Sequence, residues 1–464
     1  MKPHLSICLL FLICLLATAP ATAQPTDEAP NPFGVVEGFW VADEACALGV
    51  GWERIIFDWA QIQPNGPDDW NTLNVDERWL RDAQACNREV IAIVKHTPGW
   101  ATDRTVNIGM PRGLALPIDD PANLWANFMR RAAAHYAPFG VRRWIIWNEP
   151  DITAGTFGYE FEGTVEDYAQ LVKVSYLAAR QGNPDAIIHL AGTTYWHDIN
   201  EGRRLYLDRL LEVLTADPEA ADHSHYFDAV TLHIYYRSET VWQIVTETRT
   251  LLESYRLNDK AIWIGETNAS PNLDPDWRVE RPNWQITLEQ QSAFLVQAAA
   301  LGLAAGADHI GVYKLNDFNL PLGGESFGLL RPDGSRRPAF ATWQMIVTQF
   351  AGVTGGIFAR TETVDVVRLD AGAQQIIVAW ARTGLPAQIN VTATGTEAQF
   401  YDAYGMLVNV RPLAGVYAMG LPGALCNAVD SCPVGGAPAI LVQVAGETIV
   451  EEVTPNGIMA IPFG

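Results

Sequence analysis

The 464-residue sequence is poor in basic residues, in cysteine and in long apolar runs, and each shortage excludes a class of protein. Lysine and arginine number 31 against 53 acidic residues, and this formal net charge of −22 argues against nucleic acid or an anionic membrane as a partner. It also argues weakly against polyanionic substrates. After residue 17, no segment reaches the ~18 uncharged apolar residues that a membrane span requires.

The N-terminus has the pattern of a secretory signal. Lys2 precedes an apolar run from Ile7 to Ala17, and Ala21-Thr22-Ala23 follows as a small-x-small cleavage site. The run is short for a membrane anchor. The sequence therefore predicts a signal peptide at residues 1–23, a disordered leader rich in Pro, Asp and Ala at residues 24–32, and a secreted, extracellular protein.

Four of the six cysteines lie beyond the signal. An even number of cysteines in an exported chain favours disulfides. Cys426 and Cys432 close a short loop and are the pair that we expect to be bonded. Cys46 and Cys86 form either a bridge, if their helices are neighbours, or two free buried thiols. No spacing resembles a zinc or iron–sulfur site, and we expect neither a metal nor another cofactor.

Short apolar runs alternate with helical patterns from residue 33 onward. Eight runs have the composition of strands: Gly34–Gly38, Arg54–Trp59, Val90–Lys95, Trp144–Asn148, Ile187–Ala191, Ala229–Ile234, Ile262–Glu266 and Ile310–Leu315. The alternation predicts βα units around a parallel sheet, and eight units fit an α/β fold of the (β/α)8 TIM-barrel type over residues 33–352. A doubly wound open sheet is the alternative.

Capping signals mark several of the intervening helices. Asp120 is a predicted cap with Pro121 at the first helical position, and Thr164 opens another helix that ends before Gly182. Thr287-Leu-Glu-Gln290 reads as a capping box. After residue 352 the helical periodicity stops and short strand-like runs begin. Residues 353–464 are therefore predicted to form a small C-terminal β-sandwich. A carbohydrate-binding module is an alternative, but no group of three aromatic residues stands out to support it.

Two glutamates stand at the ends of predicted strands. Trp144-Ile-Ile-Trp-Asn-Glu149-Pro150 is an apolar run that stops at a carboxylate and a proline, and proline cannot continue a strand ladder. Ala261-Ile-Trp-Ile-Gly-Glu266-Thr-Asn268 ends in the same manner. In parallel α/β folds the carboxyl ends of the strands carry the chemistry, so both side chains are candidate catalytic groups. Two such carboxyls suit a retaining glycosidase, in which one donates a proton and the other attacks the sugar.

These two motifs resemble those of the retaining glycoside hydrolases of clan A, over residues from about 31 to the end of the chain. The resemblance implies that Glu149 is the acid/base, that Glu266 is the nucleophile, and that Asn148 binds the substrate 2-hydroxyl. The mechanism further requires Glu149 to hold a proton at rest while Glu266 is ionised. The expected partner is an oligo- or polysaccharide, and the C-terminal domain has a supporting role.

Further candidates follow from position and from the resemblance. An arginine such as Arg54 supports the nucleophile in the clan, and an ordinary salt bridge is the alternative. His233-Ile-Tyr235 places two side chains on one strand face, where family members orient the nucleophile. Aromatic and histidine residues near predicted strand ends make an aromatic-lined cleft credible; they are Trp40, Trp59, His96, Trp100, Tyr195 and Trp196. The clan usually ends strand eight in a tryptophan under the sugar, whereas Val312-Tyr313-Lys314-Leu315 stands here. Tyr313 or Lys314 is the expected substitute for this tryptophan in substrate binding.

Several alternatives compete with this interpretation. Asp43, Asp58, Asp151 and Asp198 also lie near predicted strand ends and are rival carboxylates. Gly324-Glu-Ser326-Phe-Gly328 matches the nucleophile elbow of serine hydrolases, but proline and glycine surround it, so a loop is expected. His223-Ser-His225 lacks a third ligand in sequence and is read as a loop pair. A non-catalytic carbohydrate-binding protein on a glycosidase scaffold is the rival from another class.

Overall fold

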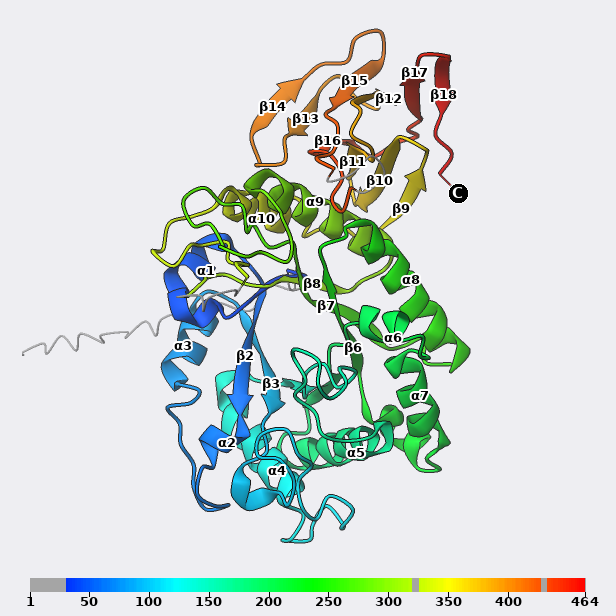
Figure 1. The fold of residues 1–464 in the computed structure, drawn as a ribbon. Helices are drawn as coiled ribbons and strands as arrows, with labels where there is room; N and C mark the ends of the chain where they lie inside the picture. The colour runs from blue at the N-terminus through cyan, green and yellow to red at the C-terminus, as the bar shows by residue number, and fades with distance from the viewer. Residues whose placement is uncertain (1–30, 319–324, 427–431, 464) are drawn as a thin grey trace, which may run out of the picture. The chain divides into compact units, whose positions relative to one another are not determined.

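The computed structural model describes residues 31–318, 325–426 and 432–463 (Figure 1). The predicted signal peptide and most of the predicted leader lie outside these ranges. Residues Asn31–Gly464 form one compact unit. In the described part of the chain, no helix has both the length and the apolar character that crossing a membrane requires.

Eight parallel strands close into a barrel in the order β1-β2-β3-β4-β5-β6-β7-β8. The strands are β1 Phe33–Val36, β2 Trp52–Asp58, β3 Glu89–Lys95, β4 Arg143–Ile146, β5 Ile187–Leu190, β6 Ala229–Tyr235, β7 Ala261–Asn268 and β8 His309–Val312. Each coincides with a predicted strand to within a few residues. The TIM-barrel prediction is confirmed, and the closed β1–β8 pairing excludes the open doubly wound sheet.

Helices alternate with the strands around the barrel. The α-helices are α1 Ala42–Leu48, α2 Trp59–Ile62, α3 Glu77–Ala85, α4 Leu124–Tyr136, α5 Val165–Gly182, α6 Trp196–Asn200, α7 Tyr206–Ala216, α8 Glu239–Ser254, α9 Leu288–Ala304 and α10 Pro338–Gln349. Short 3-10 helices lie at η1 Gly38–Val41, η2 Gly99–Ala101, η3 Ala137–Phe139 and η4 Ala220–Tyr226.

The capping predictions have mixed outcomes. Thr164 and Thr287 form the capping boxes of α5 and α9. The predicted cap Asp120 is wrong: α4 begins three residues later, and Asn123 accepts a hydrogen bond from the Ala126 amide instead. Asp120 bonds the Ala122 amide within a turn that precedes the helix, so the helix-start signal was real but one turn early.

Two antiparallel sheets follow the barrel. The first has the order β14-β13-β16-β11-β10-β9 and the second β15-β12-β17-β18. Their strands are β9 Gly355–Arg360, β10 Val364–Ala371, β11 Gln374–Ala381, β12 Ala387–Thr392, β13 Ala398–Tyr401, β14 Leu407–Val410, β15 Val416–Leu421, β16 Ala439–Val444, β17 Val450–Thr454 and β18 Gly457–Ala460. A shared apolar core fills the space between the sheets, which confirms the predicted sandwich.

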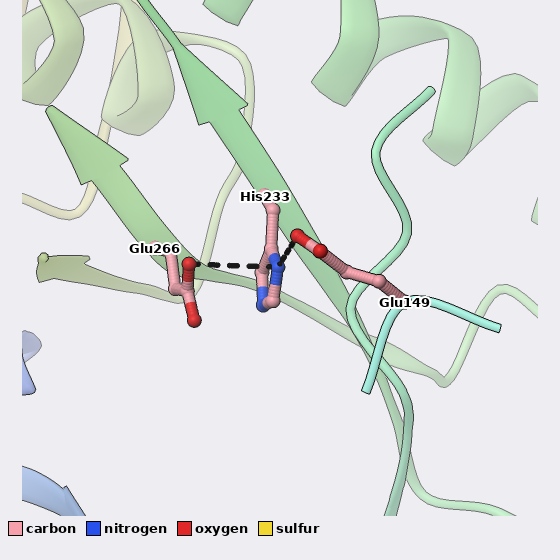
Figure 2. A group of neighbouring side chains, drawn as sticks. All are labelled: Glu149, His233 and Glu266. Carbon is pink, nitrogen blue, oxygen red and sulfur yellow. Dashed lines mark hydrogen bonds and ion pairs between the residues drawn. The ribbon is translucent and has the colours of Figure 1, made fainter. Parts of the chain in front are cut away.

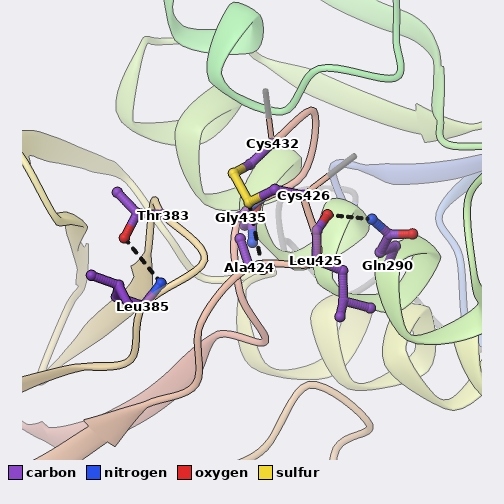
Figure 3. The surroundings of a disulfide bond; sticks show 9 residues. Gln290, Thr383, Leu385, Ala424, Leu425, Cys426, Cys432 and Gly435 are labelled. Atoms are coloured by element: carbon purple, nitrogen blue, oxygen red, sulfur yellow. Dashed lines mark hydrogen bonds between the residues drawn. A yellow bond between two sulfur atoms is a disulfide. The ribbon is translucent and has the colours of Figure 1, made fainter. Parts of the chain in front are cut away.

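The structure contains the predicted Cys426–Cys432 bridge and also a Cys46–Cys86 bridge. Cys46 at the end of α1 is joined to Cys86, which follows α3, with their Cα atoms 5.6 Å apart. This settles the alternative that the sequence left open, because α1 and α3 are neighbours. Cys426 is bonded to Cys432, and the adjacent Leu425 carbonyl accepts a hydrogen bond of 3.0 Å from Gln290 of α9 (Figure 3).

Candidate active site

Glu149 and Glu266 meet at the carboxyl ends of the barrel strands. Glu149 follows β4 and Glu266 lies near the end of β7, so strands β5 and β6 lie between the two strands that carry them. One carboxylate oxygen of each, together with a ring nitrogen of His233, lies within 4.8 Å of the others (Figure 2). In retaining glycosidases the two carboxyls are about 5 Å apart, whereas inverting enzymes separate them by about 6.5–9.5 Å. The spacing therefore has the retaining geometry.

The chain turns sharply where it delivers Glu149. Strand β4 ends at Ile146, two residues before the predicted end, because Trp147 adopts a φ of 70° and Glu149 a φ of 41°. Left-handed backbone costs non-glycine residues about 1–3 kcal/mol and concentrates at functional sites. The Glu149 amide donates to the Gly192 carbonyl at 3.0 Å, which ties the turn to the end of β5.

A β-bulge aims Glu266 into the barrel mouth. Leu232 of β6 pairs with Ile264, but the next residue, His233, pairs with Glu266, so Gly265 is an extra residue in β7. A Cβ at Gly265 would lie 2.4 Å from the Thr231 side chain, so no larger residue fits there. Bulges redirect the following side chain, and this one places Glu266 beside His233.

Glu266 is surrounded by donors that stabilise its charge. Arg54 and the Tyr235 hydroxyl donate to separate oxygens of the carboxylate. Burial raises the pKa of Glu266, but the charges of Arg54 and His233 and the hydrogen bond from Tyr235 outweigh it, so the net pKa lies below 4.5. Glu266 is therefore ionised at neutral pH, as a nucleophile must be.

His233 connects the two carboxylates. Its Nδ1 lies 2.7 Å from Glu149 Oε1 and 3.6 Å from Glu266 Oε2. Burial lowers the pKa of His233, while the adjacent Glu266 and Glu149 raise it, and the net shift is upward. The ring packs against Gly192, where a Cβ would overlap the imidazole at 2.1 Å. Glycine at this position is what allows the histidine to fit between the two acids.

Glu149, His233 and Glu266 are also a group that could hold a metal ion. The donor set argues against it. Arg54 Nη1 lies 3.5 Å from His233 Nε2. A guanidinium can only donate, so in the neutral ring Nε2 is the accepting nitrogen and Nδ1 carries the proton toward Glu149. Metal binding at Nδ1 would require that proton to move to the side that faces Arg54.

Asn148 is held by a chain of charged residues. Asn148 donates to Glu160 Oε1, and Lys95 Nζ lies 2.6 Å from Glu160 Oε2. His96 continues the chain, with Nε2 at 3.8 Å from Glu160 and Nδ1 at 2.8 Å from Asp58. Burial raises the pKa of Glu160, but hydrogen bonds from His96, Lys95 and Asn148 lower it to about 2. The fixed charge on Glu160 orients the Asn148 amide.

The two glutamates, Asn148 and Lys95 line a cavity of about 790 Å³. Four of the predicted binding residues line it with the two glutamates: Arg54, Asn148, Tyr235 and Tyr313. Tyr313 occupies the end of β8 where the clan usually has a tryptophan. The next residue, Lys314, also lines the cavity and forms an ion pair of 3.1 Å with Glu37.

Other predicted binding residues lie outside this lining. Trp59 is fully buried, stacked on Phe128, so its assignment to substrate binding is wrong: it belongs to the core. Trp100 donates to the Gln63 carbonyl and packs on the edge of Trp59. His96 reaches the site only through Glu160. Tyr195 bonds Glu247 of α8 and packs against Trp196, which places both away from the two glutamates.

The sequence reasoning missed several residues that line the cavity or support it. They are Glu37, Lys95, Phe157, Glu160, Tyr236 and Glu325. Glu37 directly follows β1 and Lys95 ends β3, so their positions at the ends of apolar strands could have identified them. Glu160 and Phe157 belong to the long connection between β4 and α5, and no local pattern marks them.

The structure shows where the serine motif, the histidine pair and the rival aspartates lie. Ser326 is buried in a loop and bonds Asp317 and Arg337, so it is not the exposed serine of a nucleophile elbow. His223 and His225 lie in η4, as the loop interpretation expected. The rival carboxylates Asp43, Asp58, Asp151 and Asp198 are absent from the described lining of the cavity.

Comparisons with known proteins agree with the fold. No protein-family model and no curated protein matches this sequence. Among solved structures, the barrel with its C-terminal sheets is that of glycoside hydrolases of families 39 and 30, so the resemblance to clan A is confirmed for the fold. At 13–14% identity these likenesses show the fold alone.

One similar structure is a family 39 glycoside hydrolase from the gut symbiont Bacteroides cellulosilyticus WH2, with a TM-score of 0.68 and 14% identity over 90% of this chain and 81% of that one. A GH30 endoxylanase from Clostridium papyrosolvens C71 matches with a TM-score of 0.57 and 13% identity, over 89% and 96%. A monomeric beta-xylosidase from Caulobacter crescentus CB15 matches with a TM-score of 0.54 and 13% identity, over 90% and 97%.

Proposed function

We propose that this protein is a secreted retaining glycoside hydrolase that cleaves β-glycosidic bonds by double displacement. The observation that carries the proposal is the approach of the Glu149 and Glu266 carboxylates to within 4.8 Å at the barrel mouth. The signal-like N-terminus supports secretion. Barrels of the same architecture in glycoside hydrolases support the class of reaction.

In the first step, Glu149 gives its proton to the glycosidic oxygen while Glu266 attacks the anomeric carbon, and the leaving sugar departs with its oxygen protonated. Arg54 and Tyr235 hold the attacking oxygen pair in place. In the second step, Glu149 removes a proton from water, and that water displaces Glu266 from the sugar. Glu149 has given its proton to the leaving sugar in the first step, so its carboxylate can accept this proton from water, which restores the protonated acid for the next cycle.

Hydrolysis of aryl β-glycosides of several sugars tests the reaction, and a Glu266→Ala variant with added azide tests the nucleophile. We expect wild-type turnover, loss of it in Glu266→Ala, and recovery by azide that yields a glycosyl azide of inverted configuration. Binding of glycans by the wild-type protein without turnover on a broad panel would instead favour a non-catalytic carbohydrate-binding protein. A Ser326→Ala variant should keep glycosidase activity.

A further inference from the structure

Four aromatic side chains form an exposed platform beside the catalytic cavity. Phe39 and Trp40 of η1, Trp79 of α3 and Phe318 lie with ring centroids 4.3–5.5 Å apart, and we call this set the Trp40 platform. Trp40 is 51% exposed although three other rings surround it. The other three rings hold the Trp40 indole in place while it faces solvent, so the flat apolar surface of a ligand can cover it.

The platform is continuous with the cavity. Glu37, which immediately precedes η1, lines the cavity and pairs with Lys314. The Lys314 ammonium lies 5.0 Å from the centroid of the Phe318 ring. A ligand that leaves the cavity over the Glu37–Lys314 pair therefore meets Phe318 and Trp40 next.

A second exposed aromatic residue stands on the other side of the cavity. Phe157 lines the cavity wall and is fully exposed. It lies in the β4–α5 connection, the segment that also carries Glu149 and Glu160. Thr153 of this segment is bonded to His197 at 3.0 Å, and Glu160 to Lys95, so both ends of the loop are anchored. Because the loop is anchored at both ends and the Phe157 ring is exposed, a ligand can contact this ring.

The two aromatic positions lie across the barrel mouth from each other. Phe39, Trp40 and Phe318 of the platform belong to the connections after β1 and β8, and Trp79 to the helix after β2. Phe157 belongs to the connection after β4. In a closed barrel of eight strands, β4 and β8 stand on opposite sides. Glu149, after β4, and Glu266, near the end of β7, approach each other to within 4.8 Å, and both line the cavity that Phe157 and Glu37 also line. A ligand that touches both aromatic positions must extend past the catalytic pair in both directions.

We propose that the Trp40 platform and Phe157 are outer sugar-binding sites on the two sides of the scissile bond, and that the substrate is a neutral saccharide chain cleaved internally. This inference rests on the proposed function. Because Glu149 protonates the leaving oxygen, the released part of the chain lies on the Phe157 side and the retained part on the Trp40 side.

The charges in the cavity support a neutral chain. The three cations among its described lining residues, Arg54, Lys95 and Lys314, are each paired with a carboxylate: Glu266, Glu160 and Glu37. An acidic sugar would need a cation that is not already neutralised, and the overall charge of −22 would repel it. Sugar rings that present apolar C–H faces to aromatic side chains and hydroxyl groups to the intervening polar residues match this surface.

The test is a chain-length series. The wild-type protein is first assayed on a panel of β-1,4-xylan, β-1,3- and β-1,4-glucans, β-mannan and β-galactan. Oligosaccharides of two to six units from the best substrate are then compared between wild type, Trp40→Ala and Phe157→Ala, beside the aryl glycoside of the single sugar. We expect each variant to lower kcat/KM on the six-unit chain about tenfold, as covering half an exposed ring predicts, and to lower it progressively less as the chain shortens.

Leu413→Ala is the matched control, because Leu413 is an exposed apolar residue of the C-terminal sheets, and it should leave every substrate unaffected. Thermal unfolding shows whether Trp40→Ala folds, and Phe157→Ala tests the idea independently. Equal losses on all chain lengths, no loss on the six-unit chain, or release of single sugars from one chain end would each overturn the inference while the proposed function stands. Absence of wild-type turnover on any glycan would overturn both.

Discussion

Replacement of Arg54 by methionine tests how the charge of the candidate nucleophile is maintained. Arg54 and Glu266 are both buried, with side chains only 6% and 9% exposed, and they form an ion pair. Removing one partner of a buried pair leaves the other charge uncompensated and typically costs about 3–5 kcal/mol. We expect Arg54→Met to lose about that much free energy of unfolding at pH 7, measured by urea denaturation.

The pH dependence of this loss has a definite sign. In the wild-type protein the pKa of Glu266 is lowered, so the stability that its charge contributes is present above 4.5 and is lost as pH falls through the folded-state pKa. Without Arg54, burial dominates and the pKa of Glu266 rises above its ordinary value. The stability difference between the two proteins should therefore narrow between pH 7 and pH 4, and the acidic limb of the kcat/KM profile should move to higher pH.

Two controls separate electrostatics from lost packing. Arg78→Met removes another arginine from an ion pair, with Asp76, but at an exposed position, and it should change stability little. The double variant Arg54→Met/Glu266→Gln removes both charges, so it should be more stable at pH 7 than Arg54→Met alone. If Arg54→Met matches wild type in stability at pH 7 and its acidic limb does not move, Arg54 does not set the charge of Glu266.

Three further changes have defined outcomes. Tyr235→Phe removes a donor to Glu266 and should lower kcat about 10- to 100-fold with little change in KM; an unchanged kcat would show that this hydrogen bond is not needed. Glu160→Gln should release the Asn148 amide and lower kcat/KM about tenfold on ordinary glycosides but less on 2-deoxy glycosides, and equal losses would contradict the positioning role. Cys46→Ser opens a 40-residue loop and should lower the free energy of unfolding by about 4 kcal/mol in urea titrations. Once reductant has also opened Cys426–Cys432, the variant and the reduced wild-type protein should unfold alike, and a remaining difference would contradict the disulfide explanation.

The fold could be predicted because a barrel strand is buried on both faces. Such strands read as short apolar runs, and all eight were found from that signal. The starts of helices were harder to predict. Asp120 and Asn123 are both good capping residues, and Asn123 caps α4 because Asp120 is already part of a turn that precedes the helix. The burial of α9 could not be predicted. The sequence predicted its capping box but not its nearly complete burial, which arises because the C-terminal sheet packs against it.

The polar residues of α9 show why the C-terminal domain was hard to interpret from sequence. Gln290 donates to the Leu425 carbonyl, and Gln297 donates to the Gly436 carbonyl and accepts from Ser238. One apolar core also runs from the barrel into β10, β11 and β16. These contacts join sequence-distant residues and leave no local pattern. They make the sheets part of the barrel's own packing, in line with a supporting role.

The site residues likewise divide into those that the sequence revealed and those that it did not. Glu149 and Glu266 were found because each interrupts an apolar run, whereas Glu160 was missed because it reaches Asn148 from an irregular connection. Trp59 was misassigned because a tryptophan at a strand end looks alike whether it faces a cavity or the core. Position along the chain identifies the end of a strand, but it does not fix the direction of the side chain there.

The surroundings of the two glutamates differ, and the difference bears on the two roles that the proposed mechanism requires. Glu266 receives Arg54 and Tyr235, and its side chain is 9% exposed, so its charge is held in a dry site and its oxygens are fixed. Glu149 receives only His233 from the described residues, is 19% exposed, and stands on a turn open to the cavity. A nucleophile needs a fixed charge, whereas an acid/base must exchange protons with the leaving group and with water. In the proposed mechanism, the unequal donors suit Glu266 to attack and Glu149 to proton transfer.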